Sequence, residues 1–115
     1  MISGAHTIIY STNPEADRAF FRDVLEFPYV DAGHGWLVFG LRGGEAGFHP
    51  AESNGKHELY LMCDDLATEM EELGEKGVKF SPVQEERWGS VTTIQLPGGG
   101  AVGLYQPKHP TALSM

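Results

Sequence analysis

The chain has 115 residues, of which 41% are hydrophobic and 10% are aromatic. This size and composition suit a single domain with one packed core. The 16 acidic residues outnumber the 8 basic ones and give a net charge of -8 at pH 7, without a cluster of Lys or Arg. We therefore expect neither nucleic acid nor an anionic membrane as a partner.

The apolar segments and the single cysteine indicate a cellular location. The longest apolar stretches have the length of a strand and fall short of the roughly 20 residues that a bilayer span needs. The N-terminus lacks the basic and apolar regions of a secretory signal. Cys63 cannot form an intrachain disulfide and lies in the apolar run 59–63, so we interpret it as a small buried side chain without a catalytic role. These features predict a cytoplasmic protein.

The first predicted strand covers residues 4–11, which mix β-branched, aromatic and small side chains. Successive side chains of a strand point to opposite faces. The two sets are His6, Ile8 and Tyr10 on one face and Ala5, Thr7 and Ile9 on the other. A helix follows, because Asn13 is a good N-cap and Pro14 suits the first turn. Its expected apolar face contains Ala16, Phe20 and Val24.

The same order of elements occurs twice along the chain. After the helix, short strands are predicted at 29–32, 36–41 and 45–49, and the polar segment 50–56 is a natural linker. The second half starts with a strand at 58–63 and a helix that Asp64 or Asp65 caps and Gly77 ends. The remaining predicted strands are 78–83, 90–96 and 101–106. Because the order repeats in halves of about 50 residues, an internal duplication is the simplest interpretation.

This order predicts an α+β fold of two βαβββ modules that form a curved mixed sheet around a trough. We expect module one at about residues 1–50, module two at about 57–107 and a C-terminal tail at 108–115. Each helix covers one face of its sheet, so the uncovered faces line the trough. The first-strand side chains with trough-facing parity are His6, Ile8 and Tyr10 in module one and Glu58, Tyr60 and Met62 in module two.

A series of motifs in both halves resembles the pattern of a known superfamily. In chain order these are His6, the capping residue Asn13, Phe20-Phe21 and Val24-Leu25 in the helix, the run 58–66, Gly77-Val78 and Trp88-Gly89. Their order and spacing resemble the glyoxalase, bleomycin-resistance and extradiol-dioxygenase superfamily, also called vicinal oxygen chelate. The resemblance covers nearly the whole chain and implies the fold of two βαβββ modules.

The resemblance also implies a metal site built from the first and last strands of each module. The first-strand positions are His6 and Glu58, and both side chains can bind a metal. The last-strand positions, usually Glu in the superfamily, fall on Gly47 and Gly103. Three protein ligands are the common minimum for a catalytic divalent ion. Two options therefore stay open: one divalent metal ion (iron, manganese, nickel or zinc), or none.

A third ligand could come from the side of the strand that Gly47 occupies. Glu45 and His49 share that side, each two residues away, or about 6.6 Å along a strand. The set His6, His49 and Glu58 has the composition of a two-histidine, one-carboxylate iron site. Without a metal, His6 and Glu58 could pair across the modules as general acid and base. We interpret the other histidines, His34, His57 and His109, as exposed.

Aromatic side chains supply the other part of a predicted binding site. Tyr10, Tyr60 and Tyr105 have trough-facing parity, and Trp88 lies in a turn where it could form a rim or lid. The predicted ligand-binding residues are Tyr10, Tyr60, Met62, Trp88 and Tyr105. We expect core or edge packing for Trp36, Phe39 and Phe48.

Three functions stay open at this point. The first is a small-molecule binding protein of the drug-resistance or sequestering type, because the two glycines remove ligands and leave room for a bulky guest. The second is a metal-dependent enzyme, a glyoxalase-like lyase or isomerase or an extradiol-type dioxygenase, with His6 and Glu58 as ligands and catalytic residues. The third is a non-catalytic interaction module. We also expect a homodimer, because exposed sheet edges gain from being covered.

Overall fold

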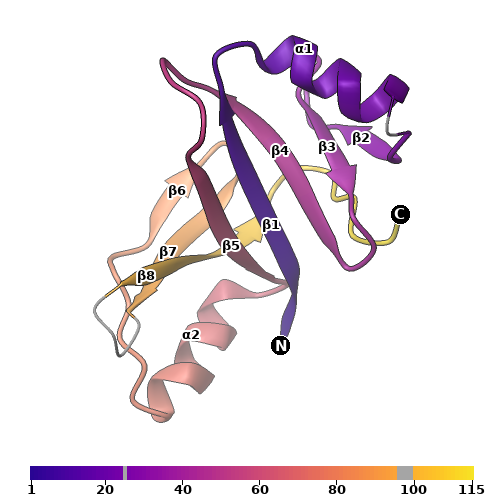
Figure 1. Cartoon of the computed structure of the whole chain (residues 1–115). Coiled ribbons are helices and arrows are strands. Elements are labelled where there is room, and N and C mark those ends of the chain that lie inside the picture. Colours follow the sequence, from indigo (N-terminus) through magenta and orange to yellow (C-terminus); the bar gives the residue numbers. More distant parts are fainter. Residues whose placement is uncertain (25, 96–99) are drawn as a thin grey trace. The chain divides into compact units, whose positions relative to one another are not determined.

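The structure is a computed structural model that describes residues 1–24, 26–95 and 100–115. These residues form two compact units, which we call module one (residues 5–58 and 110–115) and module two (residues 1–4 and 59–109). Along the chain, the order of strand, helix and three strands occurs twice (Figure 1). The predicted α+β fold of two βαβββ modules is therefore confirmed.

Module one contains a four-stranded mixed sheet. Its elements are β1 (Ile2–Ser11, of which residues 2–4 belong to module two), α1 (Pro14–Ala19), the π-helix η1 (Phe20–Val24), β2 (Tyr29–Asp31), β3 (Leu37–Gly40) and β4 (Gly44–Pro50). The strand order is β2-β3-β4-β1, with β4 parallel to β1 and antiparallel to β3. The opposed pairs of β1 and β4 include His6 with Glu45, Ile8 with Gly47 and Tyr10 with His49. Because alternate residues of a strand share a face, these pairs lie on one face of the sheet.

The helix of module one begins as predicted but buries a different face. The Asn13 side chain accepts a hydrogen bond from the backbone N–H of Ala16, with an N to O distance of 3.1 Å. Ala16 and Phe20 are exposed, whereas Arg18 is buried and Phe21 packs in the core. The predicted apolar face is therefore wrong for Ala16 and Phe20. The buried face of the helix instead contains Arg18, whose aliphatic chain can be buried although its guanidinium group is charged.

For two residues of the predicted helix, the prediction cannot be compared with the structure. Leu25 lies outside the described residues, and so does the side chain of Val24.

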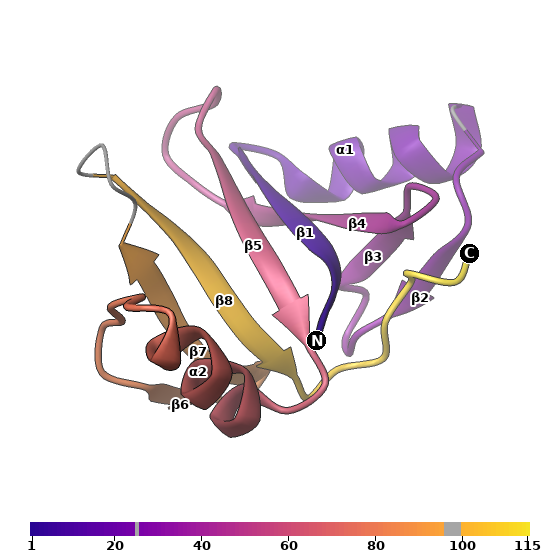
Figure 2. The same ribbon diagram turned by 90° about the horizontal axis from the view of Figure 1, so that it is seen from below.

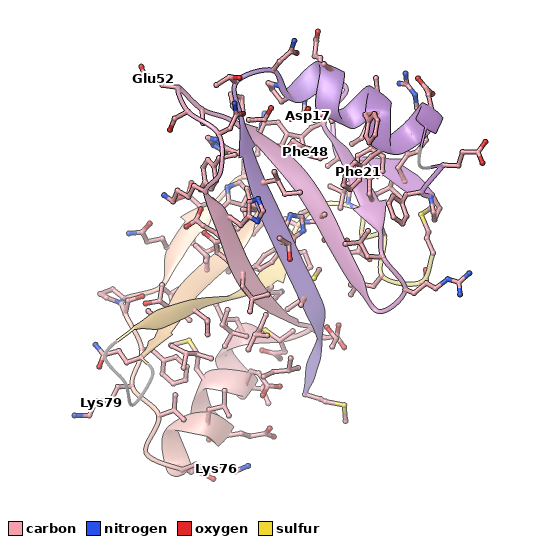
Figure 3. All side chains as sticks on the ribbon, viewed as in Figure 1. Asp17, Phe21, Phe48, Glu52, Lys76 and Lys79 are labelled. Carbon is pink, nitrogen blue, oxygen red and sulfur yellow. The ribbon has the colours of Figure 1, made fainter. Side chains whose placement is uncertain are left out.

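The core of module one lies between its helix and the sheet. The Phe21 ring lies 5.2 Å from the Phe39 ring and 5.0 Å from the Phe48 ring, measured between centroids. Figure 3 shows Phe21 and Phe48 close together beneath the helix. Ile9 of β1 packs against the same cluster. Ile9 thus faces the helix, and by alternation His6 faces the opposite side, as predicted.

Module two also contains a four-stranded mixed sheet and a helix, but its outer strand differs from the predicted one. Its elements are β5 (His57–Cys63, of which residues 57 and 58 belong to module one), α2 (Leu66–Glu75), β6 (Gln84–Glu86), β7 (Gly89–Gln95) and β8 (Ala101–Pro107). The strand order is β5-β8-β7-β6, with β8 parallel to β5 and antiparallel to β7. Leu96, predicted as the end of a strand, lies outside the described residues.

The prediction of a strand at residues 78–83 is wrong. Within that stretch Phe80 forms an isolated bridge with Ile94, and the strand itself follows at Gln84–Glu86. All residues of β6 are exposed. Polar and charged side chains are typical of an outer strand in contact with solvent, so the apolar pattern of 78–83 was misleading.

The helix of module two begins and ends as predicted. The Asp65 side chain accepts a hydrogen bond from the backbone N–H of Thr68 at 3.1 Å, and Gly77 has a φ of 88°, which glycine adopts readily. The core beside this helix consists of Cys63, Leu66 and Leu104, with Leu61, Met70, Leu73, Phe80 and Ile94 packed against it. Cys63 is therefore a buried side chain, as predicted. Among the helices of the described residues, none is both long and apolar enough to cross a membrane.

The C-terminal segment 110–115 packs against β3 of module one. A Cβ atom on Gly40 would lie 2.6 Å from the Ala112 carbonyl oxygen and 2.7 Å from Met115 Cβ. The segment can approach this closely because position 40 has no side chain. Figure 2 shows the segment, in yellow, beside β2 and β3.

Candidate functional site

A histidine and a glutamate form a buried pair on the face of module one that its helix does not cover. His6 of β1 lies opposite Glu45 of β4, and the distance from His6 Nδ1 to Glu45 Oε1 is 2.6 Å. Both residues are buried. An ionised carboxylate can only accept a hydrogen bond, so Nδ1–H is the donor. The contact fixes the imidazole ring, with Nε2 pointing away from Glu45.

The C-terminal segment holds the other carboxylate oxygen of Glu45. The backbone N–H of Ala112 donates to Glu45 Oε2 at 2.7 Å, and the Ala112 side chain is buried. Two hydrogen bonds offset the cost of burying this carboxylate. The segment is therefore a part of the site, which its non-regular sequence did not indicate.

Aromatic rings lie on the same face of module one. The ring centroids of Tyr10 and His49 are 5.1 Å apart, and those of Trp36 and His49 are 5.8 Å apart. The Lys56 ammonium lies 4.8 Å from the centre of the Tyr10 ring. Together with the His6–Glu45 pair, these rings give the face both polar groups and planar apolar surface.

Arg18 reaches from α1 to the indole ring of Trp36. Its guanidinium carbon lies 4.7 Å from the centre of that ring, and Nη2 donates to the Phe48 carbonyl oxygen at 2.6 Å. The side chain is 8% exposed, and its Nε has no hydrogen-bond partner among the described residues. Burial lowers the pKa of the guanidinium, while the carboxylates of Glu15 and Asp31 act in the opposite direction. A cation stacked on an indole ring favours one orientation of that ring.

In module two, an aromatic ring occupies the place where the resemblance implied a carboxylate. Tyr60 of β5 lies opposite Gly103 of β8, and a Cβ on Gly103 would lie 2.5 Å from Tyr60 Cε1 and 2.9 Å from Tyr60 Cγ. The Tyr60 ring packs edge-on against Trp88 and Tyr105, with centroid distances of 6.1 and 5.7 Å. Gly103 therefore makes room for the Tyr60 ring.

The residues predicted to bind a ligand differ in exposure. Trp88 is 38% exposed, and Tyr10 and Tyr60 are half-buried. Met62 and Tyr105 are 0% and 2% exposed. A molecule that approaches these faces would reach Trp88, Tyr10 and Tyr60 first, and a role for the two buried side chains stays a prediction.

The predicted set of His6, His49 and Glu58 is not assembled. The register places Gly47 opposite Ile8, not opposite His6. His49 consequently lies opposite Tyr10, four residues along the strand from the level of His6, or about 13 Å. The His49 ring instead packs against the Tyr10 ring at an interplanar angle of 45°, and its Nδ1 lies 2.7 Å from the Pro50 carbonyl oxygen.

Glu58 does not form the predicted pair with His6. It is half-buried and makes no hydrogen bond or ion pair within the described part of the chain. The carboxylate that contacts His6 is Glu45. The reason is geometric, because the parallel pairing of β1 and β4 places Glu45 directly beside His6.

The remaining histidines and Cys63 have the following surroundings. His34 and His57 are exposed, as predicted. The prediction for His109 is wrong, because it is half-buried and its Nε2 lies 3.1 Å from the Tyr105 hydroxyl. Burial, with a smaller effect of nearby Glu69 in the same direction, raises the pKa of the Cys63 thiol to about 11. This disfavours a thiolate nucleophile at neutral pH.

Comparisons with known proteins bear on the fold. No family model and no curated protein matches the sequence. Methylmalonyl-CoA epimerase from Mycobacterium tuberculosis has a similar structure, with a TM-score of 0.67 and 14% identity over 92% of this chain and 89% of that chain. A glyoxalase/bleomycin resistance protein/dioxygenase superfamily member from Vibrio splendidus gives a TM-score of 0.54 and 14% identity over 89% and 97% of the two chains. The chain has the fold of this superfamily.

A metal-containing structure also shares the vicinal oxygen chelate fold. The Mn(II)-bound glyoxalase from Novosphingobium aromaticivorans gives a TM-score of 0.58 and 17% identity over 96% of this chain and 39% of that longer chain. At such identities the likeness establishes the fold and not an activity. Any function must be argued from the side chains that this chain places on the fold.

The His6–Glu45 pair is compatible with a divalent cation in a vicinal oxygen chelate fold. Imidazole and carboxylate groups are common ligands of manganese, iron, nickel and zinc. A carboxylate that accepts from one ring nitrogen is a frequent partner of a histidine that binds metal through the other. Glu45 already accepts hydrogen bonds at both oxygens, so His6 is the better suited ligand and Glu45 the group that orients it.

The contacts of two residues of this site were not predicted from the sequence. Glu45 was weighed as a substitute ligand, but its contact with His6 depends on a strand register that the sequence does not display. Trp36 was expected in core or edge packing, and it contacts His49 on the face opposite the core. Alternation could have revealed this, because Leu37 and Phe39 face the core and Trp36 has the opposite parity.

A shallow groove of about 420 Å³ lies beside α2 in module two. Its lining residues are Asp65, Leu66, Ala67, Met70, Val83, Glu85, Ser90 and Gln106. They do not overlap with the predicted ligand-binding residues.

Proposed function

We propose that the chain binds a small organic molecule with a planar or aromatic part, as a sequestering or resistance-type protein. The observation that carries this proposal is the Tyr60 ring over Gly103. Module two presents an aromatic ring, packed against Trp88 and Tyr105, where the resemblance implied a metal-binding carboxylate. Such rings bind planar ligands through apolar contact and stacking.

Module one supports the same proposal. Tyr10, His49 and Trp36 supply ring surface on the face that α1 does not cover, and the His6–Glu45 pair supplies polar groups that can orient a ligand. The net charge of -8 favours neutral or cationic ligands over anions.

The experiment uses acetylnaphthalene, a neutral planar probe, titrated into nitrogen-15-labelled protein. The chain has 2 tryptophans, Trp36 and Trp88, so their indole N–H signals in a proton–nitrogen correlation spectrum report on the two modules separately. We expect a saturable shift of the Trp88 signal. Because ring contacts are lost, Trp88→Ala and Tyr60→Ala should each weaken binding roughly three- to tenfold.

Tyr29→Ala is the matched control. Tyr29 is also an exposed aromatic residue, but it lies opposite Phe39 on the helix-facing side of its sheet. Its loss should leave the affinity unchanged. The proposal is contradicted if neither acetylnaphthalene nor naphthalene shifts any signal of the protein.

The His6–Glu45 contact favours a second candidate function, that of a metal-dependent lyase, isomerase or dioxygenase. His6 would hold a divalent ion (iron, manganese, nickel or zinc), and Glu45 would orient the imidazole. Glu58 is a further candidate ligand or catalytic residue, because it is half-buried without a bonded partner among the described residues. A bound ion would supply Lewis-acid stabilisation of a substrate oxygen.

Elemental analysis after reconstitution with each of these metals tests the second candidate. We expect His6→Ala to abolish retention of the metal and Glu45→Gln to weaken it, because the imidazole loses its orienting carboxylate. Glu58→Ala tests its role as a ligand, and His49→Ala is the control, since His49 lies far from His6 along the strand. Wild-type protein that retains none of the metals would rule this candidate out.

We also propose a cytoplasmic homodimer. The outer strands β2 and β6 are short and largely exposed, and sheet edges of this kind gain from being covered. A reducing compartment would keep Cys63 as a thiol. Sedimentation velocity should detect a dimer at micromolar concentration, and monomer alone would refute it, while cell fractionation tests the location.

A further inference from the structure

The groove beside α2 lies on the helix-facing side of the sheet in module two. Ser90 and Gln106 line it and lie opposite each other on β7 and β8. They share their face with Leu104, which packs beside the helix, whereas the neighbouring Tyr105 contacts the Tyr60 ring on the opposite face. A ligand in this groove would therefore occupy a different face from the aromatic rings of the proposed function.

The groove combines apolar surface with a volume that suits a small molecule. Leu66 and Met70 contribute from α2, and Val83 contributes from the segment before β6. Leu66 is 3% exposed, whereas Val83 is 44% exposed and offers its side chain to a ligand. The volume of about 420 Å³ falls within the range of small-molecule sites, roughly 300–1,000 Å³.

Two carboxylates from different elements border this apolar surface. Asp65 uses one oxygen to cap α2, accepting from the Thr68 N–H at 3.1 Å. The Ser90 hydroxyl and the Lys108 ammonium both donate to Oε2 of Glu85, at 2.6 and 2.8 Å. The second oxygen of each carboxylate accepts no hydrogen bond within the described part of the chain. Among the described residues that line the groove, none is basic.

The Glu85 carboxylate already pairs with an alkylammonium group of the chain itself. The hydrogen bond from Lys108, together with that from Ser90, holds the pKa of Glu85 below its usual value. Both members of the ion pair are exposed, and Oε1 of Glu85 is left open to a second cation. The positive end of α2 opposes a cation near Asp65, but its half charge is smaller than the full charge of the carboxylate.

We propose that the groove beside α2 binds a small organic amine, with its ammonium group beside the Asp65 and Glu85 carboxylates and its apolar part against Met70 and Val83. An ammonium group has several N–H donors for the two open oxygens. A neutral ligand would gain no charge attraction, and an anion would be repelled by both carboxylates. The proposal goes beyond the proposed function, because it assigns a different class of ligand to a different face.

The test titrates phenethylamine, a cationic probe, and phenethyl alcohol, its neutral counterpart of similar shape, into nitrogen-15-labelled protein. The backbone N–H signals of Ala67, Met70 and Ser90 report on the groove, and the Trp88 indole signal reports on the aromatic face. We expect phenethylamine to shift the groove signals saturably and the Trp88 signal far less. The alcohol should bind roughly two- to fivefold more weakly, the range for one exposed ion pair.

Substitutions that remove one charge each identify the two carboxylates as the cause. Asp65→Asn keeps a good N-cap residue, and Glu85→Gln keeps the size of the side chain. Each should weaken phenethylamine binding roughly two- to fivefold and change the binding of the alcohol less than about twofold. Glu86→Gln is the matched control, because it removes the same charge from the next residue of β6, which is exposed and does not line the groove. It should change the binding of neither probe.

The proposal is overturned if phenethylamine leaves the groove signals unmoved or binds no more tightly than the alcohol. It is also overturned if Glu86→Gln weakens binding as much as Glu85→Gln, since the attraction would then belong to the net charge and not to the groove. Acetylnaphthalene should not shift the groove signals, and Glu85→Gln should not alter its effect on Trp88. Either proposal can therefore fail while the other stands.

Discussion

Alanine at position 103 should destabilise the protein by forcing the Tyr60 ring out of its place. Normal carbon–carbon contacts are about 3.5–4.0 Å. The added Cβ would lie 2.5 Å from Tyr60 Cε1 and 2.9 Å from Tyr60 Cγ, so the ring must move by about 1 Å. Tyr60 packs against Trp88 and Tyr105, which restrict that movement. Overpacking of this kind costs about 1–3 kcal/mol of unfolding free energy.

A double-mutant cycle isolates the ring as the cause. In the Tyr60→Ala background the obstacle is absent, and Gly103→Ala should be neutral or stabilising, because alanine is favoured over glycine inside a strand by roughly 0.5–1 kcal/mol. The coupling between the two substitutions should therefore reach at least about 1 kcal/mol in urea unfolding followed by circular dichroism. Gly74→Ala is the control of opposite sign, because its helix gains alanine without a clash. An equal cost of Gly103→Ala in both backgrounds would refute the reasoning.

Three further predictions concern other parts of the fold. Cys63 should not react with Ellman's reagent at neutral pH until the protein unfolds. The pKa of the thiol is raised from 9.0 to about 11 in the folded protein, so the thiol of the unfolded chain loses its proton at a lower pH. The free energy of unfolding, measured by urea titration, should therefore fall as the pH rises from about 9 to about 11. Asn13→Ala removes the acceptor of the Ala16 N–H and should cost about 1 kcal/mol, with Asn13→Gly costing much less in the same assay. Gly40→Ala should displace the C-terminal segment, which limited proteolysis would detect as faster cleavage within 110–115 than in wild type.

The predictable parts of the fold depend on interactions between near neighbours in the sequence. Asn13 and Asp65 cap their helices with side-chain oxygens that reach three residues along the chain. The alternation of β1 likewise follows from a local rule, and it assigned Ile9 to the core and His6 to the opposite face correctly.

The parts that could not be predicted depend on contacts between distant segments. A shift of the β1–β4 register by two residues keeps every side chain on its face, so the sequence cannot decide whether Glu45 or Gly47 lies beside His6. The Ala112–Glu45 hydrogen bond is similarly non-local. The burial of Arg18 was not predicted, because a charged residue is usually exposed to solvent. Its guanidinium group instead contacts the Phe48 carbonyl oxygen and the Trp36 ring.

The two modules use an equivalent glycine in different ways. Ile8 and Tyr60 occupy matching positions before the helix caps Asn13 and Asp65, and they lie opposite Gly47 and Gly103 respectively. In module two, the Tyr60 ring fills the space that the glycine leaves.

In module one, His6 and Trp36, and not Ile8, lie closest to the position that a side chain at Gly47 would take. The added Cβ would lie 3.3 Å from His6 Nε2 at position 47, but 2.5 Å from Tyr60 Cε1 at position 103. Gly103→Ala should therefore cost more unfolding free energy than Gly47→Ala, because the neighbouring ring must move further. An equal loss for the two substitutions in urea unfolding would contradict this difference between the modules.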